Sequence, residues 1–214
     1  MLRLVVMISG NGSNLQAIMD AVGRGDLSAE IAGVISDQAD AFGLERARKA
    51  GLSTCVVAPG AYAPRAEWHA ALLRAVDDFS PDLVVLAGFM RILDDAFVAH
   101  FSGRLINIHP SLLPDLRGLH THRRALADRL SHHGTSVHFV TPELDGGPVI
   151  VQARVPVLPE DSEETLTRRV QAAEHVIYPR VIQWFADGRV KLYDNQVFLD
   201  GERVAVPPVT DIDA

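Results

Sequence analysis

Residues 3–15 read RLVVMISGNGSNL, an apolar run that ends in a turn with two glycines. The run from Leu4 to Ile8 contains no polar residue, which is typical of a parallel strand buried on both faces. Gly10 and Gly12 permit a tight turn with left-handed backbone. Four apolar residues then recur at helical spacing: Leu15, Ile18, Met19 and Val22. The stretch therefore predicts a strand, a turn and a helix, the first step of an α/β fold.

Short apolar runs of the same kind recur along the chain. The predicted strands cover Arg3–Ile8, Ile31–Ile35, Ser53–Val57, Leu83–Ala87, Leu105–Ile108, Thr135–Val140 and Val149–Val157. Helical stripes run between Arg65 and Phe79 and from Leu166 to Trp184. This alternation predicts a mostly parallel, twisted sheet with helices on both faces. The last two strands leave no room for a helix between them, so we expect part of the sheet to be antiparallel, with a small hairpin over residues 191–199.

Composition excludes several classes of protein. The chain has 214 residues, of which 48% are hydrophobic and 22% charged, an ordinary globular composition. A formal net charge of -7 argues against binding to nucleic acid or to an anionic membrane. The single cysteine, Cys55, argues against a disulfide framework and favours a reducing, cytoplasmic location. No signal peptide and no membrane span is predicted.

Ligands of open α/β sheets bind beyond the carboxyl ends of the strands. The first strand is followed there by Ser9-Gly10-Asn11-Gly12, and Ser13 or Asn14 is a suitable N-cap for the helix. Free backbone N–H groups and the positive end of the helix would hold a single phosphate. The glycine spacing fits neither a dinucleotide fingerprint nor a Walker loop. An ordinary strand–helix turn is the alternative interpretation.

The fifth strand ends in a polar pair. Alternation along the strand places Asn107 and His109 on one face, and Pro110 favours extended backbone at His109. An amide beside an imidazole could stabilise a developing oxyanion. Asp145 precedes two glycines, and a fixed loop there could present its carboxylate to His109 and favour the imidazolium. The alternatives are a strand-end pair without chemistry and a common Asp-Gly turn.

Other polar residues give weaker indications. His120, His122, His132, His133 and His138 match no metal-ligand spacing, and we expect the first four in a turn and a loop, so no metal is predicted. Residues 88–93 follow the fourth strand and could hold a flat heterocycle, with ordinary packing as the alternative. Glu174 lies on the long helix, where a carboxylate is usually solvated.

Taken in order along the chain, these stretches resemble the phosphoribosylglycinamide formyltransferase family of folate-dependent enzymes. The matching stretches are ISGNGSNLQAI (residues 8–18), ADAFG (39–43), LAGFMRIL (86–93), NIHPSLLP (107–114), GLHTH (118–122), HGTSVHFV (133–140) and ELDGGP (143–148). The resemblance implies a single-domain, Rossmann-like formyltransferase fold. It also implies transfer of the formyl group of 10-formyltetrahydrofolate, as co-substrate, to the amine of glycinamide ribonucleotide in purine (IMP) biosynthesis.

Residue by residue, the resemblance implies roles for specific side chains. Asn107, His109 and Asp145 match the catalytic trio. Matches to the substrate-binding residues are Gly12, Ser13, Asn14 and Glu174. Matches to the folate-binding residues are Arg65, Met90, Arg91, Ile92, Leu93 and Asn107. The small-molecule substrates are the only partners implied, and the enzyme is expected to be a monomer or a homodimer.

The resemblance covers the chain to about Gly201. We expect one formyltransferase domain over residues 1–205, with a phosphate-binding half over about 1–100 and a folate and catalytic half over about 101–205, and a loose tail over 206–214. Asp115-Leu116-Arg117 departs from the family pattern on the loop after His109.

Three alternatives stay open beside this interpretation. Formyltetrahydrofolate hydrolase shares the trio, but we expect no room for its additional N-terminal domain. Methionyl-tRNA formyltransferase requires a basic domain that neither length nor charge favours. A binding module without catalysis is the third, and a complete trio argues against it.

Overall fold

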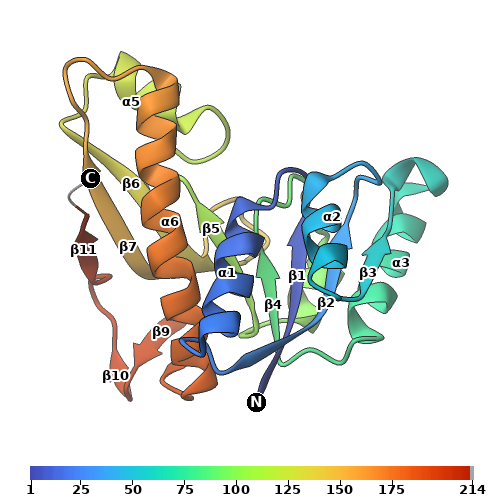
Figure 1. Cartoon of the computed structure of the whole chain (residues 1–214). Coiled ribbons are helices and arrows are strands. Elements are labelled where there is room, and N and C mark those ends of the chain that lie inside the picture. The colour runs from blue at the N-terminus through green and yellow to red at the C-terminus, as the bar shows by residue number, and fades with distance from the viewer. Residues whose placement is uncertain (213–214) are drawn as a thin grey trace. The chain divides into compact units, whose positions relative to one another are not determined.

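The computed structural model describes residues 1–212 (Figure 1). The chain divides into two compact units, Met1–Asn107 and Ile108–Ala214. The division falls within strand β5 (Leu105–His109). Among the described residues, no helix combines the length and apolar character needed to cross a membrane.

The first unit contains a parallel sheet. Its strands lie in the order β3 (Thr54–Val56), β2 (Ala29–Ser36), β1 (Leu2–Ile8), β4 (Leu83–Leu86) and β5. All of its neighbouring pairs are parallel, as the apolar runs predict. The side chains of β1 from Leu4 to Ile8 are fully buried, so the strand has no solvent face. The carboxyl ends of β2, β1 and β4 therefore meet along one edge.

Four α-helices and one short 3-10 helix connect these strands. They are α1 (Ser13–Arg24), α2 (Phe42–Lys49), η1 (Pro59–Ala61), α3 (Arg65–Asp77) and α4 (Asp95–His100). The prediction of Ser13 or Asn14 as the N-cap of α1 is wrong, because Gly12 holds that position with a left-handed φ of 73°. A Cβ on Gly12 would lie 2.7 Å from Gly43 Cα, so the close approach of α2 also requires glycine.

The second unit contains a mixed sheet. Strand β6 (His132–Phe139) pairs antiparallel with β7 (Val149–Pro156), as predicted. The prediction that His132 and His133 lie in a loop is wrong, because both belong to β6. The prediction of a loose tail over 206–214 is wrong for β11 (Val209–Asp211), which pairs parallel with β7. Arg154 of β7 donates two hydrogen bonds to the Asp211 carboxylate, which fastens this edge strand.

Two helices and a hairpin complete the second unit. They are α5 (Thr121–Ala127), α6 (Glu163–Ala186), and the three-stranded sheet of β8 (Val190–Tyr193), β9 (Gln196–Leu199) and β10 (Glu202–Arg203). The hairpin of β8 and β9 is the one predicted.

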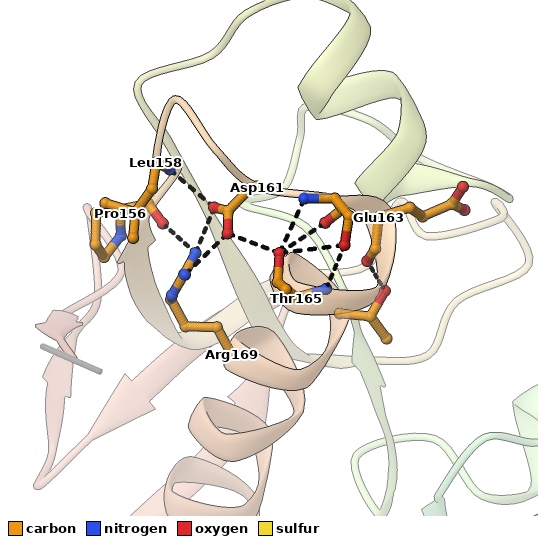
Figure 2. A network of polar contacts seen from close by, with 8 residues as sticks. Pro156, Leu158, Asp161, Glu163, Thr165 and Arg169 are labelled. Atoms are coloured by element: carbon orange, nitrogen blue, oxygen red, sulfur yellow. Dashed lines mark hydrogen bonds and ion pairs between the residues drawn. The ribbon is translucent and has the colours of Figure 1, made fainter.

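The start of α6 is fixed by a polar network (Figure 2). Ser162 and Thr165 form a reciprocal capping box, which satisfies backbone N–H groups of the first turn. Asp161 accepts two hydrogen bonds from the Arg169 guanidinium, at 2.5 and 2.9 Å. The hydrogen bond from Arg169 lowers the pKa of Asp161 to about 2, although desolvation opposes this change. Asp161 thus holds the loop before α6 against the second turn of the helix.

Candidate functional site

The glycine-rich turn after β1 is fixed by hydrogen bonds from α2. Gly43 N donates to Gly10 O (3.0 Å), and Arg46 of α2 donates to the Asn11 carbonyl oxygen (2.9 Å) and to Asn11 Oδ1 (3.1 Å). The first N–H groups of a helix have no partner within the helix, and they attract anions. Arg46 adds a positive charge beside the turn. The arrangement fits the phosphate site predicted for Gly12, Ser13 and Asn14.

The loop after β4 presents apolar side chains to solvent. Met90 and Ile92 are 66% and 62% exposed, whereas Leu93 is buried. Arg65 of α3 donates to the Ile92 carbonyl oxygen at 3.2 Å, so two of the predicted folate residues are in contact. The His69 ring lies 3.4 Å from the same oxygen through Nε2 and 3.3 Å from Asp94 through Nδ1. Apolar side chains on a loop held in this way would suit the flat heterocycle that is expected here from the sequence.

The buried carboxylate of Asp37 holds this loop through hydrogen bonds. This residue was not singled out in the sequence analysis. Asp37 follows β2 and is 1% exposed. Its oxygens accept hydrogen bonds from Ser9 Oγ (2.5 Å), Arg91 Nε (2.6 Å) and Gln38 Nε2 (2.8 Å). Burial alone would raise the pKa of Asp37, but these hydrogen bonds and the Arg91 charge lower it overall. The sequence feature that could have identified Asp37 is its position directly after an apolar strand, since such positions meet at one edge of the sheet.

The second unit brings His109 and Asp145 together. His109 Nδ1 lies 3.5 Å from Asp145 Oδ2, and both side chains are more than nine-tenths buried. The separation is that of an ion pair and exceeds a normal hydrogen bond. Thirty-five residues lie between the two along the chain, so the proximity predicted from the sequence is a tertiary contact.

Backbone groups of the loop after β5 hold both members of this pair. His109 Nε2 lies 3.1 Å from the Leu116 carbonyl oxygen, and Gly118 N donates to Asp145 Oδ2 at 2.9 Å. Between them, Arg117 forms an ion pair with Glu143. The segment that departs from the family pattern thus contacts the imidazole through Leu116 and the loop that carries Asp145 through Arg117, whereas the Asp145 carboxylate is held by the next residue, Gly118.

Strand geometry places Asn107 beside His109. The two residues alternate along β5, so their side chains leave the same face of the strand. Asp145 has a left-handed φ of 49° in the turn that follows β6. In the same turn a Cβ on Gly147 would overlap the Phe139 carbonyl oxygen, at 1.8 Å, which explains the need for glycine.

Two further imidazoles lie near the pair and stay neutral. Burial lowers the pKa of His133 to about 4, and the nearby His122 and His109 contribute. Burial also lowers the pKa of His138 to about 4, against the effects of the Phe139 carbonyl and of Asp145. They therefore add no positive charge beside His109 at neutral pH. Residues 1–212 contain no group of three or more His, Cys, Asp or Glu side chains able to hold a metal ion.

Glu174 is buried on α6, with 6% exposure. The expectation of a solvated carboxylate is therefore wrong, because the residue lies on the inward face of the helix. Burial raises the pKa of Tyr178, one turn further along, and the negative charge of Glu174 raises it again. A buried carboxylate can accept hydrogen bonds from hydroxyl groups, which fits the ribose contact that the resemblance implies.

The predicted residues thus fall into groups within each unit. In the first unit are Gly12, Ser13, Asn14, Arg65, Met90, Arg91, Ile92, Leu93 and Asn107. The second unit contains His109, Asp145 and Glu174. Arg65 contacts Ile92 in the first unit, and His109 contacts Asp145 in the second.

Comparisons with known proteins agree on one family. The family model described as formyl transferase matches residues 2–182. The phosphoribosylglycinamide formyltransferase of Escherichia coli (strain K12) is 58% identical over 207 residues, 97% of this chain and 97% of that protein. The enzyme of the same name from Haemophilus influenzae is 46% identical over 202 residues, covering 94% and 95%. Among solved structures, the phosphoribosylglycinamide formyltransferase from Coxiella burnetii superposes with a TM-score of 0.94 at 52% identity, covering 98% of this chain and 99% of that chain.

Proposed function

The chain belongs to the formyl transferase family, and we propose that it is a transferase that acts on glycinamide ribonucleotide in purine biosynthesis. The formyl donor is 10-formyltetrahydrofolate, and the products are formylglycinamide ribonucleotide and tetrahydrofolate. No metal takes part in this reaction. We assign the enzyme to the cytoplasm, which its single free cysteine, Cys55, favours.

The reaction needs stabilisation of an oxyanion and transfer of a proton. The substrate amine attacks the formyl carbon, and the formyl oxygen becomes negatively charged in a tetrahedral intermediate. The amide N–H of Asn107 and the protonated imidazole of His109 stabilise that oxygen. Asp145 orients the His109 imidazole and takes part in moving the amine proton to the departing folate nitrogen. The C–N bond to the folate then breaks.

The observation that carries the proposal is the buried pair of His109 and Asp145, 3.5 Å apart. In a buried site the carboxylate can orient the imidazole ring and stabilise positive charge that develops on it during the reaction. The neighbouring His133 and His138 are neutral at pH 7 and add no positive charge to these surroundings. An imidazole fixed at the end of a strand beside a carboxylate suits a carbonyl addition reaction.

The binding residues support the same substrates. The turn at Gly12, Ser13 and Asn14 suits the phosphate of the ribonucleotide, and Glu174 suits its ribose hydroxyls. The loop from Met90 to Leu93, with Arg65 beside it, suits the flat pterin ring.

A direct assay separates this function from its alternatives. Purified protein is mixed with 10-formyltetrahydrofolate, with and without glycinamide ribonucleotide, and tetrahydrofolate release is followed. We expect release only when the ribonucleotide is present. Release without it would identify a hydrolase, and retained binding without release in either mixture would identify a binding module.

Variants of the trio test the assigned chemistry. We expect Asn107→Ala and His109→Asn each to lower kcat by roughly 100-fold or more, with little change in substrate binding. A near-wild-type rate in either variant would remove that residue from the trio. A bulky residue in place of Gly12 should weaken the ribonucleotide more than the folate, and equal weakening of both would contradict the phosphate site.

A further inference from the structure

The carboxyl ends of three neighbouring strands are joined by one side chain, that of Asp37. Strand β2 ends just before it, and the ends of β1 and β4 lie alongside, with Ile8 opposite Ser36 and Met7 opposite Leu86. Ser9, directly after β1, donates its hydroxyl proton to Asp37 Oδ1, and Arg91 from the loop after β4 donates to Oδ2. Asp37 is thus the common acceptor for groups from both neighbouring loops.

The loop after β4 is held through Asp37 at two successive residues. Met90 N donates to Ser9 Oγ at 2.7 Å, and Ser9 Oγ in turn donates to Asp37, so the Met90 backbone is linked to the carboxylate through one hydroxyl. The next residue, Arg91, binds the carboxylate directly. Hydrogen bonds in such a chain polarise and strengthen one another. Arg65 and His69 hold the Ile92 carbonyl oxygen on the far side. The contacts through Asp37 therefore restrain Met90 and Arg91, on the side of the loop that is exposed at Met90.

We propose that Asp37 is a positioning residue for the folate, which fixes the backbone of residues 88–93 so that its peptide edges and apolar side chains match the pterin ring. The inference rests on the proposed function. According to this proposal, the Arg91 side chain binds Asp37 and not the ligand, and Ser9 links Asp37 to the loop backbone.

The phosphate turn is held by separate hydrogen bonds, so we expect loss of the Asp37 carboxylate to affect it less than the loop after β4. Ser9, the first residue of this turn, contacts Asp37, but Gly10 and Asn11 are held from α2 by Gly43 N and by the Arg46 guanidinium, and neither of these groups contacts Asp37. Loss of the Asp37 carboxylate should therefore weaken folate binding and leave ribonucleotide binding nearly unchanged. A general loss of structure would change both.

The first test measures the loop without any substrate. Amide hydrogen exchange at Met90 is compared among wild type, Asp37→Asn, Ser9→Ala and Arg91→Met. The asparagine amide would present N–H groups where the Arg91 and Gln38 donors now find an oxygen. We expect faster exchange at Met90 in all three variants, with Ser9→Ala the fastest. Exchange at the wild-type rate in Asp37→Asn and Arg91→Met would overturn the proposal.

The second test is kinetic. For Asp37→Asn and Arg91→Met we expect the KM for 10-formyltetrahydrofolate to rise on the order of tenfold, which is the loss of one charged hydrogen bond, while the KM for the ribonucleotide stays within about twofold. The double variant should be no worse than the more affected single variant, because both changes break one contact. Additive increases would mean that Arg91 binds the ligand itself, and equal increases in both KM values would mean general damage. Either result overturns the assignment.

Matched controls separate this proposal from its premise. Asp26→Asn removes a surface carboxylate that pairs with Arg24 in the same unit, and it should change neither exchange at Met90 nor either KM. If Asp37→Asn does not fold, Ser9→Ala and Arg91→Met still decide the outcome. If the wild type lacks ribonucleotide-dependent formyl transfer, the proposed function fails, whereas the exchange experiment still tests the network.

Discussion

Mild acid should destabilise the folded protein through two buried histidines of β6. His133 and His138 are 1% and 2% exposed, and burial lowers the pKa of each to about 4 in the folded state, from 6.5. Below pH 6.5 the unfolded chain gains a proton at each residue, whereas the folded protein stays unprotonated there until about pH 4. Their contribution to stability is therefore full above pH 6.5 and declines as the pH falls toward 4.

The magnitude follows from the two pKa values. A shift from 6.5 to about 4 corresponds to about 3 kcal/mol per histidine over the whole window. Between pH 7 and pH 5 the unfolded state takes up most of one proton per site, which gives a loss of about 2 kcal/mol for each histidine. Two sites together lose about 4 kcal/mol, a large share of the stability of a typical domain.

Urea unfolding at pH 7 and at pH 5 measures this loss. We expect His133→Gln and His138→Gln each to lose about 2 kcal/mol less than wild type between the two pH values, and the double variant about 4 kcal/mol less. Val137→Ala removes buried apolar volume from the same strand and should lower stability equally at both pH values. A double variant whose stability falls with pH as steeply as that of wild type would refute the reasoning.

Three further predictions concern the charged groups of the second unit. Asp145→Asn should lower kcat by roughly 100-fold and leave the ribonucleotide Kd nearly unchanged, as steady-state kinetics and calorimetry would measure; an unaltered kcat would exclude the carboxylate from catalysis. Arg117→Met breaks a solvent-exposed ion pair with Glu143, so kcat should fall by less than about fivefold, because such pairs contribute at most about 1 kcal/mol. A 100-fold fall in kcat would give Arg117 a larger role than positioning a loop. Asp161→Ala leaves the largely buried Arg169 guanidinium with the Pro156 carbonyl oxygen but without its carboxylate, and should lower the free energy of unfolding by about 3 kcal/mol, measured by urea titration at pH 7. A change below about 1 kcal/mol would place that pair among ordinary surface contacts.

The strands could be predicted from the sequence because buried parallel strands are almost wholly apolar. Leu4 to Ile8 and Leu83 to Leu86 show this without interruption. Helix α2 was not predicted, since it buries Gly43, Leu44 and Ala47 and so has only one large apolar residue inside. Strand β11 was not predicted either, because its pairing depends on the edge of β7 and on the Arg154–Asp211 contact, neither of which is a local signal.

Some features of the candidate site could likewise be predicted from local sequence, whereas others depend on contacts between residues far apart in the chain. Gly12 and the pair of Asn107 and His109 are visible in short motifs, because glycine and alternation have direct backbone consequences. The contact between His109 and Asp145 could be suggested by the sequence, but only the tertiary structure gives its distance. Residue patterns alone gave no indication that Glu174 is buried, because an isolated carboxylate on a helix is solvated far more often than it is buried.

Buried carboxylates connect these observations physically. Removing a carboxylate from water costs free energy unless hydrogen-bond donors replace the lost hydration. Each buried carboxylate therefore needs donors from other parts of the chain. Asp37 accepts hydrogen bonds from Ser9, Gln38 and Arg91. Asp161 accepts them from Arg169 and from backbone and hydroxyl donors. Each carboxylate therefore dictates where the donating loops lie, although in the sequence it resembles an ordinary turn residue. This need for donors restrains loops that must hold a ligand in one geometry, because a displaced loop would leave a buried charge without its partner.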